Sequence, residues 1–421
     1  MPVEPQILDV YLKENFVGEL ISNNSTLSFV YDKTYLDCSN AIKLSASMPL
    51  CADVFNHAIV APFFSGLLPD EGVRYRLAQC LRLSENNIFG LLKIIGGECA
   101  GAVSVHPKGT VLNQYIKSSY RILEESEANE ILSSLDKMPL LAGEEDIRMS
   151  GAGAQDKLMI LIMNNKIAIP THNTPSTHII KPVIKGFDYS VHNEFFCMQL
   201  AKSVKLPVPE VSIYWLNEKP YYLIERYDRR LQKDGSIIRL HQEDFCQAFH
   251  VPPEIKYEKE GDPTLEQCFS LLAERISSGF MAGRNKITLF RGVLFNYLIG
   301  NGDAHGKNFS LLYEGNAESL APFYDLLSTA VYGDAHRATM AMKIGRHYRF
   351  RDIYFHHWEQ FGEKIGFRSD FVEREIKNMC HAVEKNATSL MIKFNNNERT
   401  ASPVYERIIN IITINHQRII K

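Results

Sequence analysis

Hydrophobic and polar positions follow two different periods along this chain. Residues 8–20 (LDVYLKENFVGEL) alternate on either side of a short polar stretch, a pattern that predicts a β-hairpin. Between Gly66 and Leu92 the leucines recur at roughly helical spacing, which predicts helix. We expect a pair of strands to follow at residues 96–105 (GGECAGAVSV). The first part of the chain is therefore expected to combine short strands with helices.

A second strand-rich stretch follows further along the chain. Its clearest element is residues 158–170 (LMILIMNNKIAIP), where two apolar runs flank Asn164 and Asn165 and predict a hairpin with a two-residue turn. Beyond about Leu240 the spacing becomes helical, and we expect helices as far as the C-terminus. Between these two regions we expect a strand, a helix and a further strand pair, at residues 177–182, 193–204 and 211–227.

The composition indicates a protein with more than one structural unit. Of the 421 residues, 45% are hydrophobic and 10% aromatic, which is enough for a core in two or three units. The first ten residues lack a basic region that leads into an apolar run, so no secretory signal is expected. The longest apolar stretch, residues 57–68, is interrupted by Pro62 and Gly66 and is too short to span a bilayer. These features predict a soluble, cytoplasmic protein with no membrane partner.

Cysteine spacing and charge argue against two further kinds of site. None of the 8 cysteines forms a C-x-x-C pair, so we expect buried free thiols and neither a zinc site nor a redox motif. The net charge of −3 argues against a dedicated nucleic-acid binder. The basic run at residues 343–351 (KIGRHYRFR) is either a solvated face or a minor contact with a phosphate backbone, and the sequence leaves both open.

The strongest chemical signal is the segment NGDAHGKN, residues 301–308. Phosphoryl transfer to a hydroxyl needs a carboxylate near the attacking oxygen and metal ligands that neutralise charge between the phosphates. Asp303 and Asn308 have the five-residue spacing that protein kinases use for these two roles, and Asp325 follows in PFYDLL as a second carboxylate. Each feature alone is equally compatible with a polar turn, but together they indicate a phosphoryl-transfer site.

Three upstream segments could complete such a site. Small residues at 150–157 (SGAGAQDK) would let backbone N–H groups approach phosphates, although position 156 is Asp where G-x-G-x-x-G has Gly. Lys181 on the expected strand could reach the phosphates, and Glu194 on the next helix could pair with it. The segment Glu225–Tyr227 could offer backbone groups to an adenine edge. A generic loop, solvated side chains and a charged strand end are the structural alternatives.

The order of these segments decides between the two interpretations. A small-residue loop, a strand lysine, a helix glutamate, a linker, D-x-x-x-x-N and a downstream Asp succeed one another as in protein kinases, each on an element of the expected type. We therefore predict an α+β, two-lobed protein-kinase-like fold, with a β-rich N-terminal module and a helical C-terminal lobe. The expected boundaries are 1–140 for the module, 141–235 for the β-rich part with the phosphate loop, and 236–421 for the helical lobe with the catalytic loop.

The same motifs resemble those of the HipA family of bacterial toxin kinases. The motifs that carry the resemblance are MSGAGAQDK (149–157), THIIKP (177–182), NEFFCMQLAK (193–202), IERYDR (224–229), RLHQEDFCQAF (239–249), NGDAHGKNFS (301–310) and PFYDLL (322–327). FFSGLLPDEGVRYRLA (63–78) and GGECAGAVSV resemble the N-terminal module of that family. The resemblance covers roughly residues 7–330.

The resemblance implies a serine/threonine-protein kinase with ATP and Mg²⁺ as cofactors. Asp303 would be the catalytic base, and Asn308 and Asp325 the metal ligands. The implied ATP-binding residues are Ala152, Gly153, Ala154, Gln155, Asp156, Lys157, Lys181, Glu225, Arg226, Tyr227, His305, Lys307, Asn308, Tyr324 and Asp325. Ser150 falls where the family has an autophosphorylated serine. A phosphoserine there would add about −1.5 to −2 charges and repel ATP, so autophosphorylation is expected to switch the enzyme off.

The resemblance also implies partners. The usual protein substrate is an aminoacyl-tRNA synthetase, often the glutamate enzyme, whose phosphorylation stalls translation and growth. The usual partner is a small HipB-like helix-turn-helix antitoxin, through which the kinase associates with operator DNA.

Two other functions remain open from the sequence. One is a small-molecule kinase related to aminoglycoside phosphotransferases, which would phosphorylate an aminoglycoside without a protein acceptor. The other is a catalytically silent co-repressor that binds DNA with an antitoxin, which the filled catalytic positions argue against.

Overall fold

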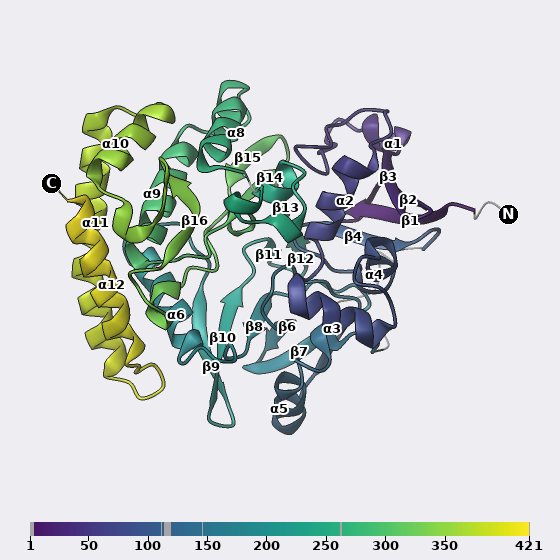
Figure 1. The fold of residues 1–421 in the computed structure, drawn as a ribbon. Helices are drawn as coiled ribbons and strands as arrows, with labels where there is room; N and C mark the ends of the chain where they lie inside the picture. Colours follow the sequence, from purple (N-terminus) through teal and green to yellow (C-terminus); the bar gives the residue numbers. More distant parts are fainter. Residues whose placement is uncertain (1–3, 111, 113–118, 145, 262, 421) are drawn as a thin grey trace. The chain divides into compact units, whose positions relative to one another are not determined.

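The protein has an α+β fold that contains both antiparallel sheets and helices (Figure 1). The computed structural model describes residues 4–110, 112, 119–144, 146–261 and 263–420. The chain divides into two compact units, each made of three segments that are separate in sequence. Unit 1 consists of Met1–Pro182, Ile224–Glu254 and Leu311–Ala317, and unit 2 of Val183–Leu223, Ile255–Ser310 and Glu318–Lys421. The predicted division at residues 140 and 235 stays a prediction.

Unit 1 begins with a four-stranded sheet in the order β3-β2-β1-β4. Its strands are β1 (Gln6–Leu12), β2 (Asn15–Asn23), β3 (Thr26–Tyr31) and β4 (Val103–Pro107). The predicted N-terminal hairpin is confirmed, because β1 and β2 pair antiparallel. The accompanying helices are α1 (Lys33–Leu36), α2 (His57–Gly66), α3 (Glu71–Leu81) and α4 (Ile88–Ile95). Buried side chains of the sheet and of α2 and α4 form one continuous hydrophobic core.

The prediction of a strand pair at residues 96–105 is wrong, since only β4 forms there. Residues 96–102 are irregular, with a single bridge from Glu98 to Met149. Gly101 has a φ of +72°, and a Cβ there would lie 2.8 Å from the backbone nitrogen of Gln242. The backbone of this stretch therefore approaches a distant segment closely and leaves the extended conformation that a strand requires.

A second sheet of unit 1 contains neighbouring strands in the order β5-β7-β6-β8. These are β5 (Ser119–Ile122), β7 (Lys166–Thr171), β6 (Leu158–Met163) and β8 (His178–Lys181). The predicted hairpin is confirmed: Asn164 and Asn165 have φ values of 52° and 62°, as a tight hairpin turn requires. The remaining elements of this unit are α5 (Glu125–Ser133), η1 (Pro139–Leu141), β11 (Arg229–Leu231), β12 (Ile237–Arg239), β13 (His241–Asp244), α7 (Phe245–Ala248) and most of β14 (Ser310–Glu314).

Unit 2 is mainly helical, as predicted for the C-terminal part. Its helices are α6 (Ser190–Ser203), α8 (Leu265–Ser277), α9 (Arg284–Ile299), α10 (Phe355–Lys364), α11 (Ser369–Asn395) and α12 (Val404–Ile419). Helix α9 is largely buried and packs against α8, α11 and α12 (Figure 1). Its aromatic side chains Phe290 and Tyr297 contact Trp358 edge-on, with ring centroids 5.9 and 5.6 Å apart. This core fixes the helix from which the predicted catalytic segment, residues 301–308, continues.

Short strands interrupt the helical part of the chain, and these were not predicted. They include β15 (Ala317–Leu320), β16 (Thr339–Ile344) and β17 (His347–Arg349). The strands β9 (Val211–Leu216) and β10 (Lys219–Glu225), by contrast, confirm the predicted strand pair. Short 3-10 turns occur at Pro253–Ile255, Glu258–Glu260, Gly306–Asn308, Thr329–Tyr332 and Phe350–Asp352.

Two predictions about composition can be compared with the structure. All eight cysteines are free thiols, but only five are buried, and Cys38 and Cys80 are exposed. Among the residues that the structure describes, we find no helix with the length and apolar character needed to cross a bilayer.

Candidate active site

The predicted catalytic segment begins where α9 ends. Gly300 takes the left-handed conformation that terminates the helix, with φ 69° and ψ 40°. The next residue, Asn301, is buried and makes two hydrogen bonds to Asn296. The Asn301 N–H donates to the Asn296 backbone oxygen at 2.9 Å, and Asn301 Nδ2 donates to Asn296 Oδ1 at 2.7 Å. The N–H of Gly302 then donates to Thr329 Oγ1 at 2.7 Å. The chain therefore reaches Asp303 in a conformation fixed on both sides.

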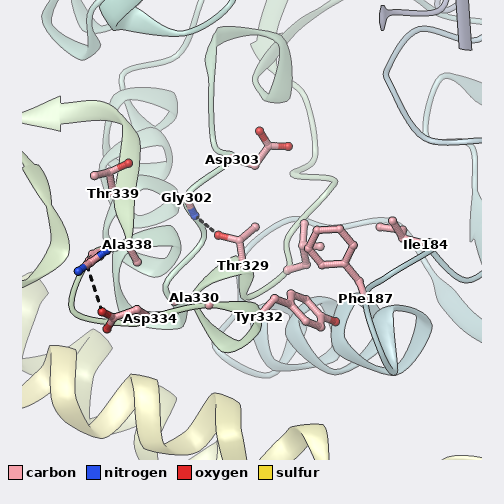
Figure 2. Close-up of a pocket in the computed structure, with 13 residues that line it drawn as sticks. Ile184, Phe187, Gly302, Asp303, Thr329, Ala330, Tyr332, Asp334, Ala338 and Thr339 are labelled. Carbon is pink, nitrogen blue, oxygen red and sulfur yellow. Dashed lines mark hydrogen bonds and ion pairs between the residues drawn. The ribbon is translucent and has the colours of Figure 1, made fainter. Parts of the chain in front are cut away.

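Asp303, the predicted base, has a partly exposed carboxylate in this fixed segment (Figure 2). Its side chain is 46% exposed, whereas that of the neighbouring His305 is only 6% exposed. Tyr257 donates its hydroxyl to Asp303 Oδ1 at 2.6 Å, and His305 Nε2 lies 3.8 Å from the same oxygen. A carboxylate that is oriented by a phenol and still reaches solvent meets the geometric requirement for a general base.

The other residues of the segment fold back onto Asp303. Asn308 donates from Nδ2 to the backbone oxygen of Asp303 at 2.7 Å, which closes a loop between the two residues of the five-residue spacing. Tyr324 donates its hydroxyl to the backbone oxygen of Lys307 at 2.7 Å and lies 2.6 Å from Ser310 Oγ. These bonds join the segment 301–308 to the PFYDLL segment, so within unit 2 the structure brings the predicted residues of both motifs together.

Asp325 stands in a special backbone conformation in the second motif. Its φ is +52°, and its backbone oxygen accepts from Asn301 Nδ2 at 3.3 Å. Tyr222 is a neighbour of both Asp325 and Glu194: burial raises the pKa of the Tyr222 hydroxyl well above its usual value, and the carboxylates of Glu194 and Asp325 raise it further. Glu194 is buried, and both carboxylates belong to unit 2.

A single amide side chain of α6 holds the segment that follows Asp325. Asn193 Nδ2 donates to the backbone oxygen of Ser328 at 2.9 Å and to Tyr332 Oη at 3.1 Å. The N–H of Ser328 donates in return to Asn193 Oδ1 at 2.8 Å. The helix that carries Glu194 and the segment that carries Asp325 are thereby fixed to each other.

The donor types in unit 2 fit a magnesium ion. Mg²⁺ prefers oxygen ligands and is often held by one or two protein groups together with nucleotide phosphates and water. Asn308 uses its amide nitrogen as a donor to Asp303, which leaves its carbonyl oxygen as the chemically suitable ligand, and Asp325 supplies a carboxylate. Across the described part of the chain, no group of three or more His, Cys, Asp or Glu residues could hold a metal ion by itself.

The predicted phosphate loop belongs to unit 1. Asp70 donates its N–H to the backbone oxygen of Gly153 at 3.1 Å, and Gly153 has a φ of +105°. Asp156, the residue that departs from the glycine-rich pattern, forms an ion pair with Arg76 at 2.5 Å. Lys157 Nζ contacts the backbone oxygen of Ala152 within the loop. The loop is therefore closed on itself and held by α3.

Ser150 is buried at the start of this loop. Only 1% of the residue is exposed. Its Oγ donates to the backbone oxygen of Leu67 at 2.7 Å, and its N–H donates to the backbone oxygen of Glu98 at 2.7 Å. A phosphate group does not fit this position while both bonds are present. Phosphorylation of Ser150 therefore requires the start of the loop to move away from Leu67 and Glu98.

Lys181 and the predicted linker also lie in unit 1. Lys181 is buried at the end of β8, and Gln155 Nε2 donates to the backbone oxygen of the next residue, Pro182, at 3.1 Å. This bond joins the phosphate loop to the strand that carries the lysine. Glu225 is exposed at the end of β10, and Tyr227 donates its hydroxyl to Gln242.

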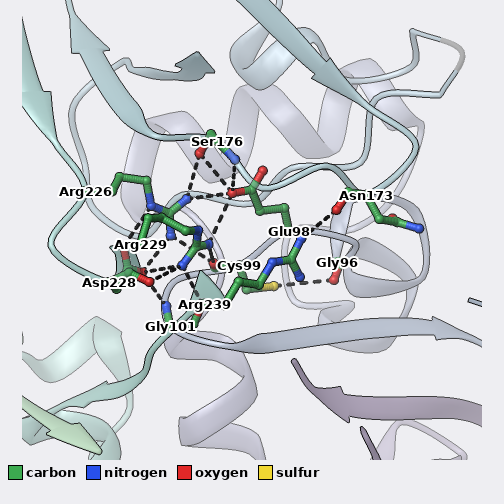
Figure 3. Close-up of polar contacts among 10 residues, drawn as sticks. All are labelled: Gly96, Glu98, Cys99, Gly101, Asn173, Ser176, Arg226, Asp228, Arg229 and Arg239. Atoms are coloured by element: carbon green, nitrogen blue, oxygen red, sulfur yellow. Dashed lines mark hydrogen bonds and ion pairs between the residues drawn. The ribbon is translucent and has the colours of Figure 1, made fainter. Parts of the chain in front are cut away.

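Arg226 does not reach outward, because it belongs to a buried ion cluster that the sequence analysis missed (Figure 3). Its guanidinium lies 3.0 Å from Glu98 Oε1 and 2.7 Å from Asp228 Oδ2. Its backbone N–H donates to Thr177, and its backbone oxygen accepts from Arg229. These contacts engage both the side chain and the backbone of Arg226, and the adenine-facing role of Glu225, Arg226 and Tyr227 stays a prediction.

The ion cluster combines three arginines with two carboxylates. Arg229 Nη2 lies 3.1 Å from Glu98 Oε1, and Ser176 adds bonds from its N–H and hydroxyl to the same oxygen at 2.8 and 2.9 Å. Burial alone raises the pKa of Glu98, but Arg226, Arg229 and Arg239 outweigh it and hold the pKa below its usual value. The carboxylate is therefore charged in the folded protein and joins the segments around residues 98, 176 and 226–239.

Unit 2 contains a pocket of about 580 Å³ beside Asp303 (Figure 2). It is lined by Ile184, Phe187, Gly302, Asp303, Leu327, Thr329, Ala330, Tyr332, Gly333, Asp334, Arg337, Ala338 and Thr339. Of the predicted site residues, only Asp303 lines it. The sequence analysis missed the pocket, since its residues share no short motif and come together only in the fold.

Comparisons with known proteins agree with the two-part organisation of the motifs. Residues 149–387 match the family model described as the HipA-like C-terminal domain, and residues 8–106 match that of the HipA N-terminal domain. The protein Y4mE of Sinorhizobium fredii (strain NBRC 101917 / NGR234) is 39% identical over 382 residues, which cover 89% of each chain. The serine/threonine-protein kinase toxin HipA of Shewanella oneidensis is 29% identical over 89% of this chain and 87% of its own.

A solved structure shares the fold over almost the whole chain. A chain in the complex of HipA, HipB and operator DNA from Shewanella oneidensis MR-1 superposes with a TM-score of 0.83 and 25% identity. The superposition covers 97% of both chains.

Proposed function

Because the chain belongs to the HipA family of protein kinases, we propose that it transfers the γ-phosphoryl group of ATP to a serine or threonine hydroxyl of another protein. One observation carries the proposal: the partly exposed carboxylate of Asp303 is oriented by Tyr257 and enclosed by the loop that Asn308 closes. A carboxylate at this point can take the proton of the attacking hydroxyl, while the metal ligands stand five and more residues away.

The residues divide the chemistry between them. Asp303 orients the acceptor hydroxyl and accepts its proton, and Asn308 and Asp325 are the residues that would hold Mg²⁺. When bound, Mg²⁺ neutralises charge on the phosphates. His305 and Lys307 line the nucleotide from the segment 301–308, and Tyr324 lines it from the PFYDLL segment. The loop 152–157 and Lys181 contact the phosphates, and Glu225 and Tyr227, on either side of the buried Arg226, contact the adenine.

The biological role follows from the relatives. Shewanella oneidensis HipA is named a serine/threonine-protein kinase toxin, and its solved complex contains HipB and operator DNA. By analogy, this chain inhibits growth by phosphorylating a protein of translation, an aminoacyl-tRNA synthetase such as the glutamate enzyme. It acts in the cytoplasm, is held by a HipB-like helix-turn-helix antitoxin, and meets operator DNA mainly through that partner. Autophosphorylation at Ser150 limits its activity.

The test compares three full-length proteins with Mg-ATP and a cell lysate. Asp303→Asn keeps the size of the side chain and an acceptor for Tyr257 but removes the base. We expect it to lower the rate of phosphoryl transfer by at least about 10²-fold, while the affinity for ATP changes little. Asp352→Asn is the matched control, because Asp352 is a surface carboxylate of unit 2 that is 43% exposed beside Arg351.

Phosphosite mapping by mass spectrometry gives the readout. The proposal holds if serine and threonine phosphosites appear with the wild type and the control and disappear with Asp303→Asn. An unchanged phosphosite profile with Asp303→Asn contradicts the assigned base. Phosphorylation of an aminoglycoside with no protein acceptor contradicts the protein-kinase function itself.

A further inference from the structure

Of the predicted base and the predicted nucleotide-binding residues of unit 2, only the base, Asp303, lines the pocket. Asp303 and Gly302 line it, but His305, Lys307, Asn308, Tyr324 and Asp325 do not. A general base must reach both the proton that it removes and the group that carries this proton. The side of Asp303 that faces the pocket is therefore the side from which an acceptor hydroxyl can approach.

The pocket has one apolar side and one charged side (Figure 2). Ile184 and Phe187, from the loop before α6, lie on one side of Thr329 together with Tyr332. The rings of Phe187 and Tyr332 meet edge-on, with centroids 4.8 Å apart at 88°. Phe187 is 42% exposed, so a large aromatic surface faces outward beside the base. On the other side Asp334 pairs with Arg337 at 3.4 Å.

The walls of the pocket are rigid where they meet the catalytic segment. Thr329 Oγ1 accepts from the N–H of Gly302 at 2.7 Å, and Tyr332 is held by Asn193. A Cβ at Gly302 would lie 2.5 Å from the backbone oxygen of Thr339, so the catalytic segment also touches the start of β16 closely. The apolar side of the pocket therefore keeps a fixed position relative to Asp303.

We propose that this pocket binds the acceptor segment of the protein substrate, and that Phe187 and Tyr332 select a bulky apolar residue next to the phosphorylated serine or threonine. The inference rests on the proposed kinase function and names the substrate sequence that it takes. A volume of about 580 Å³ suits a few side chains of an extended segment. Since alternate residues of an extended chain share a face, the apolar residue lies within about two positions of the acceptor.

Burial of an apolar side chain against an aromatic pair gives a modest preference for substrates that carry such a side chain. One or a few methylene groups in a hydrophobic pocket change kcat/KM by about 10- to 200-fold. Replacing the flanking leucine, isoleucine, methionine or phenylalanine of a substrate by alanine should therefore lower kcat/KM by about tenfold or more. The KM for ATP should not change, because the pocket contains none of the predicted nucleotide ligands.

The first measurement uses the phosphosites that wild-type protein produces in lysate, with the Asp303→Asn reaction as background. We expect a bulky apolar residue within two positions of the acceptor more often than around other serines and threonines of the same proteins. Sites with no such enrichment overturn the proposed pocket but leave the kinase function intact. A complete absence of wild-type phosphosites overturns the kinase function itself.

The second measurement is a double-mutant cycle between enzyme and substrate. A synthetic peptide from the strongest mapped site is compared with its apolar-to-alanine variant, using wild type and Phe187→Ala. The alanine replacement should cost about tenfold in kcat/KM with wild type and less than about twofold with Phe187→Ala. Phe280→Ala is the matched control, because Phe280 is 44% exposed in unit 2 and does not line the pocket. Equal losses with all three proteins show that Phe187 does not read the flanking residue.

Discussion

Replacing Glu98 by glutamine tests whether the buried ion cluster holds unit 1 together. Glutamine has nearly the size of glutamate but no charge, so the substitution removes the ion pairs without opening a cavity. The Glu98 side chain is only 3% exposed, and its Oε1 lies 3.0 Å from Arg226 and 3.1 Å from Arg229. After the change, Asp228 alone faces three buried guanidinium groups.

The magnitude follows from the burial of the partners. The side chains of Arg226 and Arg229 are 5% and 2% exposed, so neither can recover solvent contacts when Glu98 loses its charge. Breaking a buried pair by removing one partner costs about 3–5 kcal/mol. With a urea dependence of about 2 kcal/mol per molar, the unfolding midpoint of unit 1 should fall by about 1.5–2.5 M.

Two optical probes separate the units in the urea titration. The two tryptophans of the chain, Trp215 and Trp358, both lie in unit 2. Their fluorescence therefore reports on unit 2, whereas far-UV circular dichroism reports on both units. Glu314→Gln is the matched control, since Glu314 belongs to unit 1 and forms an exposed pair with Arg230, with side chains 47% and 53% exposed. Such a pair contributes about 1 kcal/mol or less.

The effect of the same variant on stability should depend on pH. Arg226, Arg229 and Arg239 hold the pKa of Glu98 below its ordinary value of 4.5 in the folded protein. A carboxyl group with a lowered folded-state pKa stabilises the protein above its unfolded-state pKa and loses this contribution as the pH falls through the folded-state value. The difference in stability between wild type and Glu98→Gln should therefore have its full size at pH 7 and shrink below about pH 4.5. Equal midpoint shifts for Glu98→Gln and Glu314→Gln at pH 7, or a difference from wild type that is as large at pH 3 as at pH 7, refute the reasoning.

Two further predictions concern the catalytic segment and the phosphate loop. Gly300→Ala should destabilise unit 2 by about 1–3 kcal/mol more than Gly345→Ala. A Cβ at Gly300 would lie 2.7 Å from Ile411, whereas a Cβ at Gly345 would have nothing within 4 Å. Both glycines have positive φ, so the backbone strain is common to the two variants. Tryptophan fluorescence during urea unfolding measures the difference, and equal effects would show that only backbone strain matters. Ser150→Asp places a charge where the hydroxyl donates to Leu67, and it should weaken ATP binding about tenfold or more, measured by calorimetry. Ser150→Ala should keep kinase activity, so a fully active Ser150→Asp or an unfolded Ser150→Ala contradicts the proposed switch.

Local patterns predicted the elements that are set by local physics. The hairpin at Asn164 and Asn165 was found because a two-residue turn selects residues that tolerate positive φ. The segment 301–308 was singled out because Asp303 and Asn308 have the five-residue spacing of a kinase catalytic loop. The sequence predicted roles for these two residues, and the hydrogen bond between them is a finding of the structure.

Features built from distant segments could not be predicted in this way. The ion cluster joins Glu98 to Arg226 and Asp228, and the sequence showed only a charged strand end. The expected strands at 96–105 failed for the same reason, since Gly101 packs against a segment more than a hundred residues away. The aromatic wall of the pocket likewise needs Phe187 and Tyr332, which come together only when α6 is packed against the segment after Asp325.

The bonds of Asn193 have a consequence for selectivity. One amide holds Tyr332 in the wall of the pocket and Ser328 three residues beyond Asp325. A protein segment that pushes Tyr332 aside must therefore strain the bonds that hold the backbone of the segment after Asp325. Ill-fitting proteins would then dock almost as well as good ones but turn over slowly, so that discrimination falls on kcat and not on KM.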